Sequence, residues 1–231
     1  MNAFFRRTLR LISVVPAAAL LFAACSDSSG PSIPSLGSTS TYAILAGSAI
    51  SCVTGATVGG DIGLSPGAAS SITGFPPCTR SGATHAADAA AAAAQSDLTV
   101  AYNGLAGLAC GTTITADLGG TTLAPGVYCS GSALNLTGVL TLSGSGTYVF
   151  QAGSALTVAT SGSVVLANGA EAKNVYWKVG SSATLGNGSA VKGNVVALTS
   201  VSLGTTANLV GRALARNGAV SLAGTNTITL P

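Results

Sequence analysis

An imperfect repeat of about 18 residues in the C-terminal half of the chain strongly limits the folds that it can adopt. Its clearest copies surround Thr184, Ser202 and Ser221, which lie 18 and 19 residues apart. The step from Thr157 to Thr184 is 27 residues, because an insertion around 168–173 separates them. A period of about 18 residues with three short strands matches one coil of a triangular β-solenoid, whereas propeller blades and leucine-rich repeats are longer.

The composition agrees with β-structure and many tight corners. Charged residues make up 6% of the chain, hydrophobic residues make up 48%, and 31 residues are glycine. Disordered chains combine high charge with few apolar residues, so this composition argues against general disorder. No apolar run of about 20 residues follows the N-terminal segment, which argues against a bundle of membrane-spanning helices.

Residues 1–24 are expected to be an export signal, because arginines precede an apolar stretch at 11–21. Phe22-Ala23-Ala24-Cys25 then resembles the site at which a bacterial lipoprotein is cleaved before a diacylated cysteine, here Cys25. An ordinary cleaved signal peptide is the alternative. Residues 25–40 are rich in Ser, Gly and Pro and are expected to be a flexible tether, and residues 41–231 form the folded domain.

Cleavage before Cys25 changes the charge balance. The whole chain has nine basic and six acidic residues, and the signal contains three arginines and no acid. Nine minus three leaves six basic residues against six acidic residues, a net charge of zero. The charge therefore gives no support to a nucleic-acid partner.

Four cysteines remain in the expected domain: Cys52, Cys78, Cys110 and Cys129. An even number in an exported chain indicates disulfides, and three pairings are possible. Pairing Cys52 with Cys78 and Cys110 with Cys129 is favoured, because each pair closes a local loop on one side of the segment described next. Zinc is the rival, but no C-x-x-C spacing occurs and the chain has one histidine, so no metal site is expected.

A helix is expected at about 84–108, where alanine dominates. Leu98, Tyr102 and Leu105 fall at helical spacing and would form an apolar stripe that packs on a flat surface. Thr84 is the expected N-cap.

Outside this helix, alternation within the repeat predicts which side chains point inward and which outward. One outward column would be Asn135, Thr157, Thr184, Ser202 and Ser221. A second, at the next corner, would be Thr160, Asn187 and Thr205. A third would be Ser163, Ala190, Asn208 and Thr227. None of these positions carries a charge, which is compatible with a ligand-binding surface and also with an ordinary solvated face.

Several segments together resemble a known family. They include Tyr42–Gly47, Val58–Gly67, Leu123–Tyr128, Asn174–Ala183 and Gly211–Val220. From about Leu36 to the C-terminus the chain is similar to the microbial ice-binding (antifreeze) proteins. This resemblance implies a mostly β protein: an irregular right-handed β-solenoid, or β-helix, of triangular cross-section with one long α-helix packed along its side.

The resemblance also implies the function: adsorption to ice through a flat face, without cofactor, as a monomer that inhibits ice growth and recrystallisation. The family has a T-A/G-x-T/N motif, which only Thr54-Gly55-Ala56-Thr57 matches fully here. The residues expected to contact ice are Thr54, Thr57, Thr157, Thr160, Ser163, Thr184, Asn187, Ser202, Thr205 and Asn208. The protein would be anchored at the cell surface or outer membrane by its lipid, or secreted.

The sequence predicts no catalytic site, because acidic residues are scattered and no nucleophile motif occurs. Tyr148, Phe150, Tyr176 and Trp177 are expected to pack in the core rather than to form a sugar-binding platform. A structural or adhesive surface module that binds glycans or other cells is the alternative function.

Overall fold

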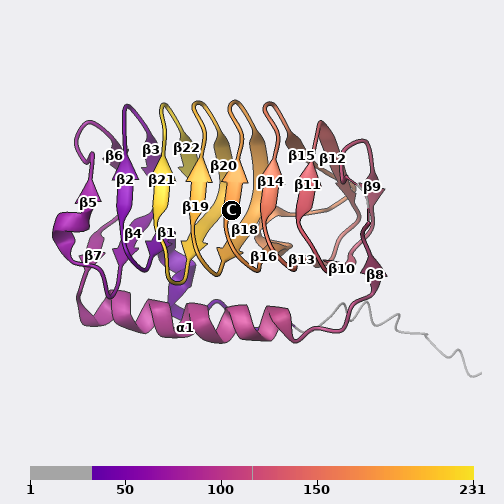
Figure 1. Cartoon of the computed structure of the whole chain (residues 1–231), viewed down its shortest axis with the longest axis horizontal. Coiled ribbons are helices and arrows are strands. Elements are labelled where there is room, and N and C mark those ends of the chain that lie inside the picture. Colours follow the sequence, from indigo (N-terminus) through magenta and orange to yellow (C-terminus); the bar gives the residue numbers. More distant parts are fainter. Residues whose placement is uncertain (1–32, 116) are drawn as a thin grey trace, which may run out of the picture.

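Short parallel strands joined by corners form most of the regular structure (Figure 1). The computed structural model describes residues 33–115 and 117–231, so the predicted signal segment and Cys25 lie outside the described residues. The strands form a seven-stranded and a fifteen-stranded sheet. The larger sheet bends sharply, which divides the solenoid into three faces and confirms the predicted architecture of a β-solenoid with one flanking helix.

The front face is the outer surface of the seven-stranded sheet. Its strands, in spatial order, are β11 (Leu134–Leu136), β14 (Leu156–Val158), β17 (Ala183–Leu185), β19 (Val201–Leu203), β21 (Val220–Leu222), β2 (Ile50–Cys52) and β5 (Ile72–Thr73).

The rear face comprises one half of the bent sheet. Its strands are β9 (Thr122–Leu123), β12 (Val139–Ser143), β15 (Ser163–Ala167), the first halves of β18 (Ala190–Ala197) and β20 (Asn208–Ala215), β22 (Thr227–Thr229), β3 (Thr57–Gly59) and β6 (Thr79–Arg80).

The helix face comprises the other half. Its strands are β8 (Thr112–Thr113), β10 (Gly126–Ser130), β13 (Tyr148–Ala152), β16 (Val175–Val179), the second halves of β18 and β20, β1 (Tyr42–Ala46), β4 (Asp61–Leu64) and β7 (Thr84–Ala86). Three 3₁₀ turns complete the described elements: η1 (Gly37–Thr41), η2 (Ala69–Ser71) and η3 (Ala172–Asn174).

The coils do not stack in sequence order. β21 of the last coil pairs with β19 on one side and with β2 of the first coil on the other. The first and last coils are therefore neighbours in the middle of the stack, and the chain must travel from one end to the other before its second half begins. The helix α1 (Ala89–Ala106) makes that crossing (Figure 1). Its 18 residues rise about 27 Å, close to the roughly 29 Å across the six gaps between seven strands.

The helix begins later than predicted, and its cap is Asp88 rather than Thr84. Asp88 has an extended backbone, and its Oδ1 accepts the Ala91 N–H at 2.8 Å. Thr84 lies in β7, in register with Ile62 of β4. Residues 84–86 form a strand rather than the first turn of the helix, because hydrogen bonds to the neighbouring strand satisfy their backbone groups.

The predicted apolar stripe of the helix packs against the helix face. Leu98, Tyr102 and Leu105 are buried in one cluster with Val149 and Leu214 of the strands. The Tyr102 hydroxyl also donates to the Val179 carbonyl at 3.4 Å.

The core inside the coils consists of stacked inward side chains. Leu156, Leu185 and Leu203, each next to a member of the predicted outward column, are buried. Phe150 and Trp177 stack with ring centroids 4.2 Å apart. Both aromatic rings are almost fully buried, so neither can form a platform for a sugar.

Glycines allow the larger sheet to bend in the middle of β18 and β20. Gly193 and Gly211 pair with each other and have φ values of 110° and 157°. A Cβ at Gly211 would overlap the Gly193 carbonyl, so a side chain cannot be accommodated there. The bend joins the rear face to the helix face.

The structure has the two disulfides that the sequence favoured, Cys52–Cys78 and Cys110–Cys129. Cys78 directly precedes β6 and Cys110 lies two residues before β8. In the larger sheet, β6 and β8 are the two strands at opposite ends of the longest run of hydrogen-bonded neighbours. Each disulfide therefore fastens an edge strand, where backbone groups lack a partner strand on one side.

The segment before β1 packs on the helix and is not a free tether over its described part. Ile33 and Leu36 pack against the helix-face cluster. The Ser38 amide and hydroxyl donate to Asp97 at 2.7 and 2.6 Å, and these hydrogen bonds lower the pKa of Asp97. Apolar side chains within the Ser/Gly/Pro-rich stretch explain this docking.

Within the described residues, no helix is both long enough and apolar enough to cross a membrane.

Candidate functional site

A continuous row of hydroxyl and amide side chains runs along the front face. The ladder pairs each member with the next: Asn135, Thr157, Thr184, Ser202, Ser221, Ser51 and Thr73. The first five form the predicted column, and the structure adds two from the N-terminal coils. Adjacent strands lie about 4.8 Å apart, so the row repeats at that interval.

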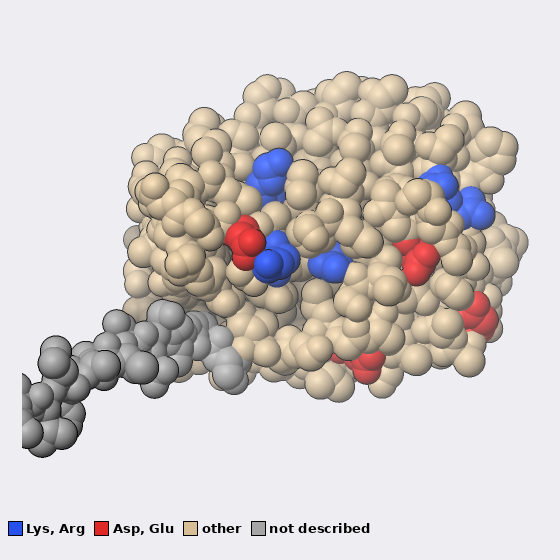
Figure 2. Space-filling model, turned by 180° about the vertical axis from the view of Figure 1, so that it is seen from behind, with Lys and Arg blue, Asp and Glu red and all other residues tan. Residues whose placement is uncertain are grey.

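The surface around this row is uncharged and made of small residues. None of the seven strands contains Asp, Glu, Lys or Arg. In five of the strands, the residue two positions before the row member along the chain is small: Ala155, Ser182, Ser200, Ala219 and Ala49. Figure 2 shows charged side chains spread over the side of the molecule that faces away from the front sheet. The row therefore stands on a surface without long side chains that could block a flat ligand.

A ridge of corner residues borders the front face. Three positions after the row, successive coils carry Thr160, Asn187, Thr205, Gly224 and Thr54.

The residue after each ridge position has a left-handed backbone in four of these coils. The φ values are 59° at Ser161, 64° at Gly188, 60° at Thr206 and 62° at Gly55. A Cβ is strained in this conformation, so Gly55 and Gly188 adopt it more readily than Ser161 and Thr206 do.

Two amide side chains of the predicted site bond to the neighbouring coil. Asn187 Oδ1 accepts the Thr205 backbone N–H at 2.9 Å. Asn208 Oδ1 accepts the Thr227 backbone N–H at 3.1 Å.

The third predicted column lies on the rear face. Its members are in register and continue into the N-terminal coils: Val139, Ser163, Ala190, Asn208, Thr227, Thr57 and Thr79. Val139 and Ala190 interrupt the hydroxyl and amide groups. The neighbouring column includes Lys192 beside Val210, so a charge lies on this face.

The ten predicted residues thus divide among three regions. Thr157, Thr184 and Ser202 lie on the front face. Thr54, Thr160, Asn187 and Thr205 lie on the ridge. Thr57, Ser163 and Asn208 lie on the rear face. One flat ligand can touch the front face and the ridge together, but not the whole set.

The sequence reasoning missed Ser51 and Thr73 as members of the row. A signal for Ser51 was present, because Ser51, Thr54 and Thr57 have the same spacing as Ser202, Thr205 and Asn208. The repeat is clearest in the C-terminal half, and the helix interrupts it between the two halves.

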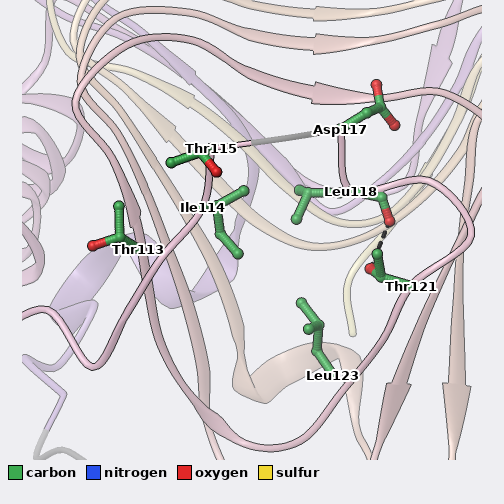
Figure 3. A pocket seen from close by; sticks show the side chains of 7 residues that line it. All are labelled: Thr113, Ile114, Thr115, Asp117, Leu118, Thr121 and Leu123. Carbon is green, nitrogen blue, oxygen red and sulfur yellow. Dashed lines mark hydrogen bonds between the residues drawn. The ribbon is translucent and has the colours of Figure 1, made fainter.

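A hollow of about 220 Å³ lies at the β8 and β9 end of the solenoid (Figure 3). It is lined by Thr113, Ile114, Thr115, Asp117, Leu118, Thr121 and Leu123. The carboxylate of Asp117 accepts hydrogen bonds from Gly119 N and from both the N–H and the hydroxyl of Thr137, at 2.6, 2.9 and 2.9 Å. Burial opposes ionisation, but these bonds outweigh it and lower the pKa of Asp117. A carboxylate held in this way is a poor proton acceptor, and no other ionisable side chain lines the hollow.

The basic residues of the helix face have structural contacts. Arg212 donates to the Ser40 carbonyl and to Asn194 Oδ1, which ties the N-terminal segment to β20. Lys178 and Arg216 lie about 5 Å from the Tyr102 ring centroid, at 5.0 and 4.9 Å. Within residues 33–115 and 117–231, no group of three His, Cys, Asp or Glu side chains could hold a metal ion.

Comparisons with known proteins agree on one group. The family model described as Ice-binding-like matches residues 44–229. An ice-binding protein of Nostoc sp. (strain HG1) is 45% identical over 202 residues, which is 85% of this chain and 74% of that protein.

Solved structures give the same result. An ice-binding protein from an Antarctic biological consortium aligns with a TM-score of 0.83 and 38% identity, covering 95% of this chain and 96% of that one. An ice-binding protein from the Antarctic ascomycete Antarctomyces psychrotrophicus aligns with a TM-score of 0.81 and 40% identity, covering 87% of this chain and 99% of that one.

Proposed function

The chain belongs to the ice-binding-like protein family, and from this premise we propose that it adsorbs to ice through the front face and the adjoining ridge. The observation that carries the proposal is the row of seven uncharged polar side chains in register across one parallel sheet. The row needs no second copy of the chain, so we propose that the protein acts as a monomer.

The chemistry of the row suits an ordered water surface. Its interval of about 4.8 Å is close to an oxygen repeat of the ice lattice. Hydroxyl groups bind water molecules, and the methyl groups of threonines such as Thr157 and Thr184 favour ordered water beside them. Because the strands are rigid, little conformational entropy is lost on adsorption. Adsorbed protein then restrains growth and recrystallisation of the ice beneath it.

The front face is a better candidate than the rear face. Lys192 would hold water in a geometry set by its own charge, and Val139 and Ala190 break the row of polar groups there. The front strands contain no such interruption.

The alternative, an adhesive module for glycans, is less well supported by the described residues. Aromatic platforms commonly bind sugar rings, but Phe150 and Trp177 are buried. The family relatives favour ice as the ligand.

We also propose that the protein is exported and lipidated at Cys25, with simple secretion as the alternative. The signal-like segment and the two disulfides support export, because disulfides persist in oxidising compartments. The intact mass of protein purified from membranes tests the lipid: the expected mature chain begins at diacylated Cys25, and an unmodified N-terminus would contradict it.

Labelling of ice tests the main function. The chain from residue 26 is coupled through its amines to a fluorescent dye, since described lysines such as Lys173 and Lys178 lie away from the front face. A single ice crystal is then grown slowly in a micromolar solution. The expected result is a shaped, fluorescent crystal and slower recrystallisation of small grains. A dark crystal that grows as in buffer would refute ice binding and leave the adhesive alternative.

A further inference from the structure

Asn187 differs from the other ridge residues because its side chain bonds to the next coil. Its Oδ1 accepts the Thr205 N–H at 2.9 Å. The residues on either side of this contact use backbone carbonyls instead: Gly204 N donates to Leu185 O at 2.7 Å, and Gly188 N donates to Thr205 O at 2.9 Å. The amide thus replaces one backbone acceptor at the point where the strand ends and the corner begins.

The neighbouring coil leaves room for this contact. A Cβ at Gly204 would overlap Asn187 Oδ1 and would lie 2.8 Å from the Asn187 backbone nitrogen, so both the amide and the close approach of the two backbones need glycine at this position.

Similar contacts occur in the next coil. Asn208 Oδ1 accepts the Thr227 N–H at 3.1 Å, and the buried Asn226 donates to the Gly204 and Ala207 carbonyls, the latter at 2.9 Å. Amide side chains thus link three successive coils, at the ridge through Asn187 and at the start of the rear strands through Asn208 and Asn226.

We infer that Asn187 is a positioning residue, which sets the spacing of the ridge, and is not itself an ice contact. This inference rests on the proposed function. Asn187 holds the backbone of Thr205 one coil away, so that the Thr205 hydroxyl keeps its interval from the front-face row. An asparagine in the T-A/G-x-T/N corner then has a different physical role from a threonine there.

The two roles give opposite results for Asn187→Thr. Threonine is the residue of the same ridge column at 160 and 205, so a direct ice contact would be kept or improved by the substitution. A positioning amide would be lost, because the shorter hydroxyl side chain removes the carbonyl acceptor. Asn103→Thr is the matched control: Asn103 is exposed on α1, away from the front face and the ridge, and its side chain makes no hydrogen bond to the described residues.

Hydrogen exchange of the Thr205 amide measures the contact without any ice. Removing one hydrogen bond should lower its protection about five- to tenfold. Gly204→Ala keeps Asn187, but the added Cβ would crowd both the amide oxygen and the backbone nitrogen of Asn187, so it should lower the same protection. Thermal hysteresis and the ice planes labelled by fluorescent protein are measured for all three variants, together with melting temperature.

The expected result is that Asn187→Thr and Gly204→Ala lower both Thr205 protection and hysteresis, while Asn103→Thr lowers neither. Unchanged protection in Asn187→Thr would overturn the inference, as would wild-type hysteresis despite lost protection. An equal loss of hysteresis in Asn103→Thr would show that the loss does not come from the Asn187 contact and would also overturn it. Failure of wild-type protein to bind ice would instead refute the proposed function, and the amide measurement would still report the contact.

Discussion

Thr184 lies near the middle of the front-face row, and replacing it by tyrosine tests the choice of face. Its neighbours in the row are Thr157 and Ser202, each one strand away, at about 4.8 Å. Side chains on a strand stand roughly perpendicular to the sheet. A tyrosine ring at 184 would therefore project beyond both neighbours and hold a flat lattice away from them.

The expected loss follows from this geometry. Thr184, Thr157 and Ser202 lose contact with the lattice, which is three of the seven members of the row. At about 1 kcal/mol for each hydrogen-bonded anchor, the loss is roughly 3 kcal/mol. This corresponds to about a hundredfold weaker adsorption. Folding should change little, by about 0.5 kcal/mol, because the position is exposed and tyrosine is favourable in strands.

The assay is thermal hysteresis and recrystallisation inhibition as a function of protein concentration. Because its adsorption is about a hundredfold weaker, the Thr184→Tyr protein should reach the same effect only at about a hundredfold higher concentration. Thr229→Tyr is the matched control, since Thr229 is an exposed strand threonine on the rear face. Full activity of Thr184→Tyr, or loss of activity in Thr229→Tyr alone, would refute the choice of the front face.

Three further predictions concern stability. Replacing Cys110 and Cys129 by serine opens a 19-residue loop and should lower the free energy of unfolding by about 3 kcal/mol, measured by urea denaturation; an unchanged midpoint would contradict it. Thr206→Gly removes a β-branched side chain at φ 60°, and it should raise the free energy of unfolding by about 1 kcal/mol, unlike Thr205→Gly. The lowered pKa of Asp117 means that its ionised form stabilises the fold fully above its ordinary pKa of about 3.9, and that this contribution is lost as the pH falls through the folded value. Thermal melts of Asp117→Asn between pH 2 and 6 should therefore depend less on pH than those of wild type, and equal slopes would exclude this role.

Much of the C-terminal half could be predicted from the repeat. The step from Ser202 to Ser221 and the inward leucines placed the outward columns correctly, because alternation along a strand leaves one choice once the core side is known. The N-terminal coils were harder. Ser51 pairs with Ser221, a residue 170 positions later, and no local pattern encodes that neighbour.

The helix shows the same division between local and tertiary control. The alanine run predicts a helix, and α1 is present. Its start was wrong by several residues because Thr84 pairs with Ile62 of β4, which the sequence near Thr84 does not reveal. The prediction of a flexible tether was wrong for its described part for a similar reason. Ser38 donates hydrogen bonds to Asp97, which comes close to it only in the folded structure.

The sequence by itself determined the repeat, the residues that alternate in and out of the core, and the absence of charge from the outward row. These properties depend on neighbours within one strand or one coil. Only the tertiary structure decided that Thr157, Thr184 and Ser202 share a face with Ser51, whereas Ser163 and Asn208 do not. The physical reason is that corners rotate the chain from one face to the next, and that hydrogen bonds between distant coils determine which rows join. The same hydrogen bonds between coils distinguish the role of an amide bonded to the next coil, such as that of Asn187, from the role of a hydroxyl that faces outward.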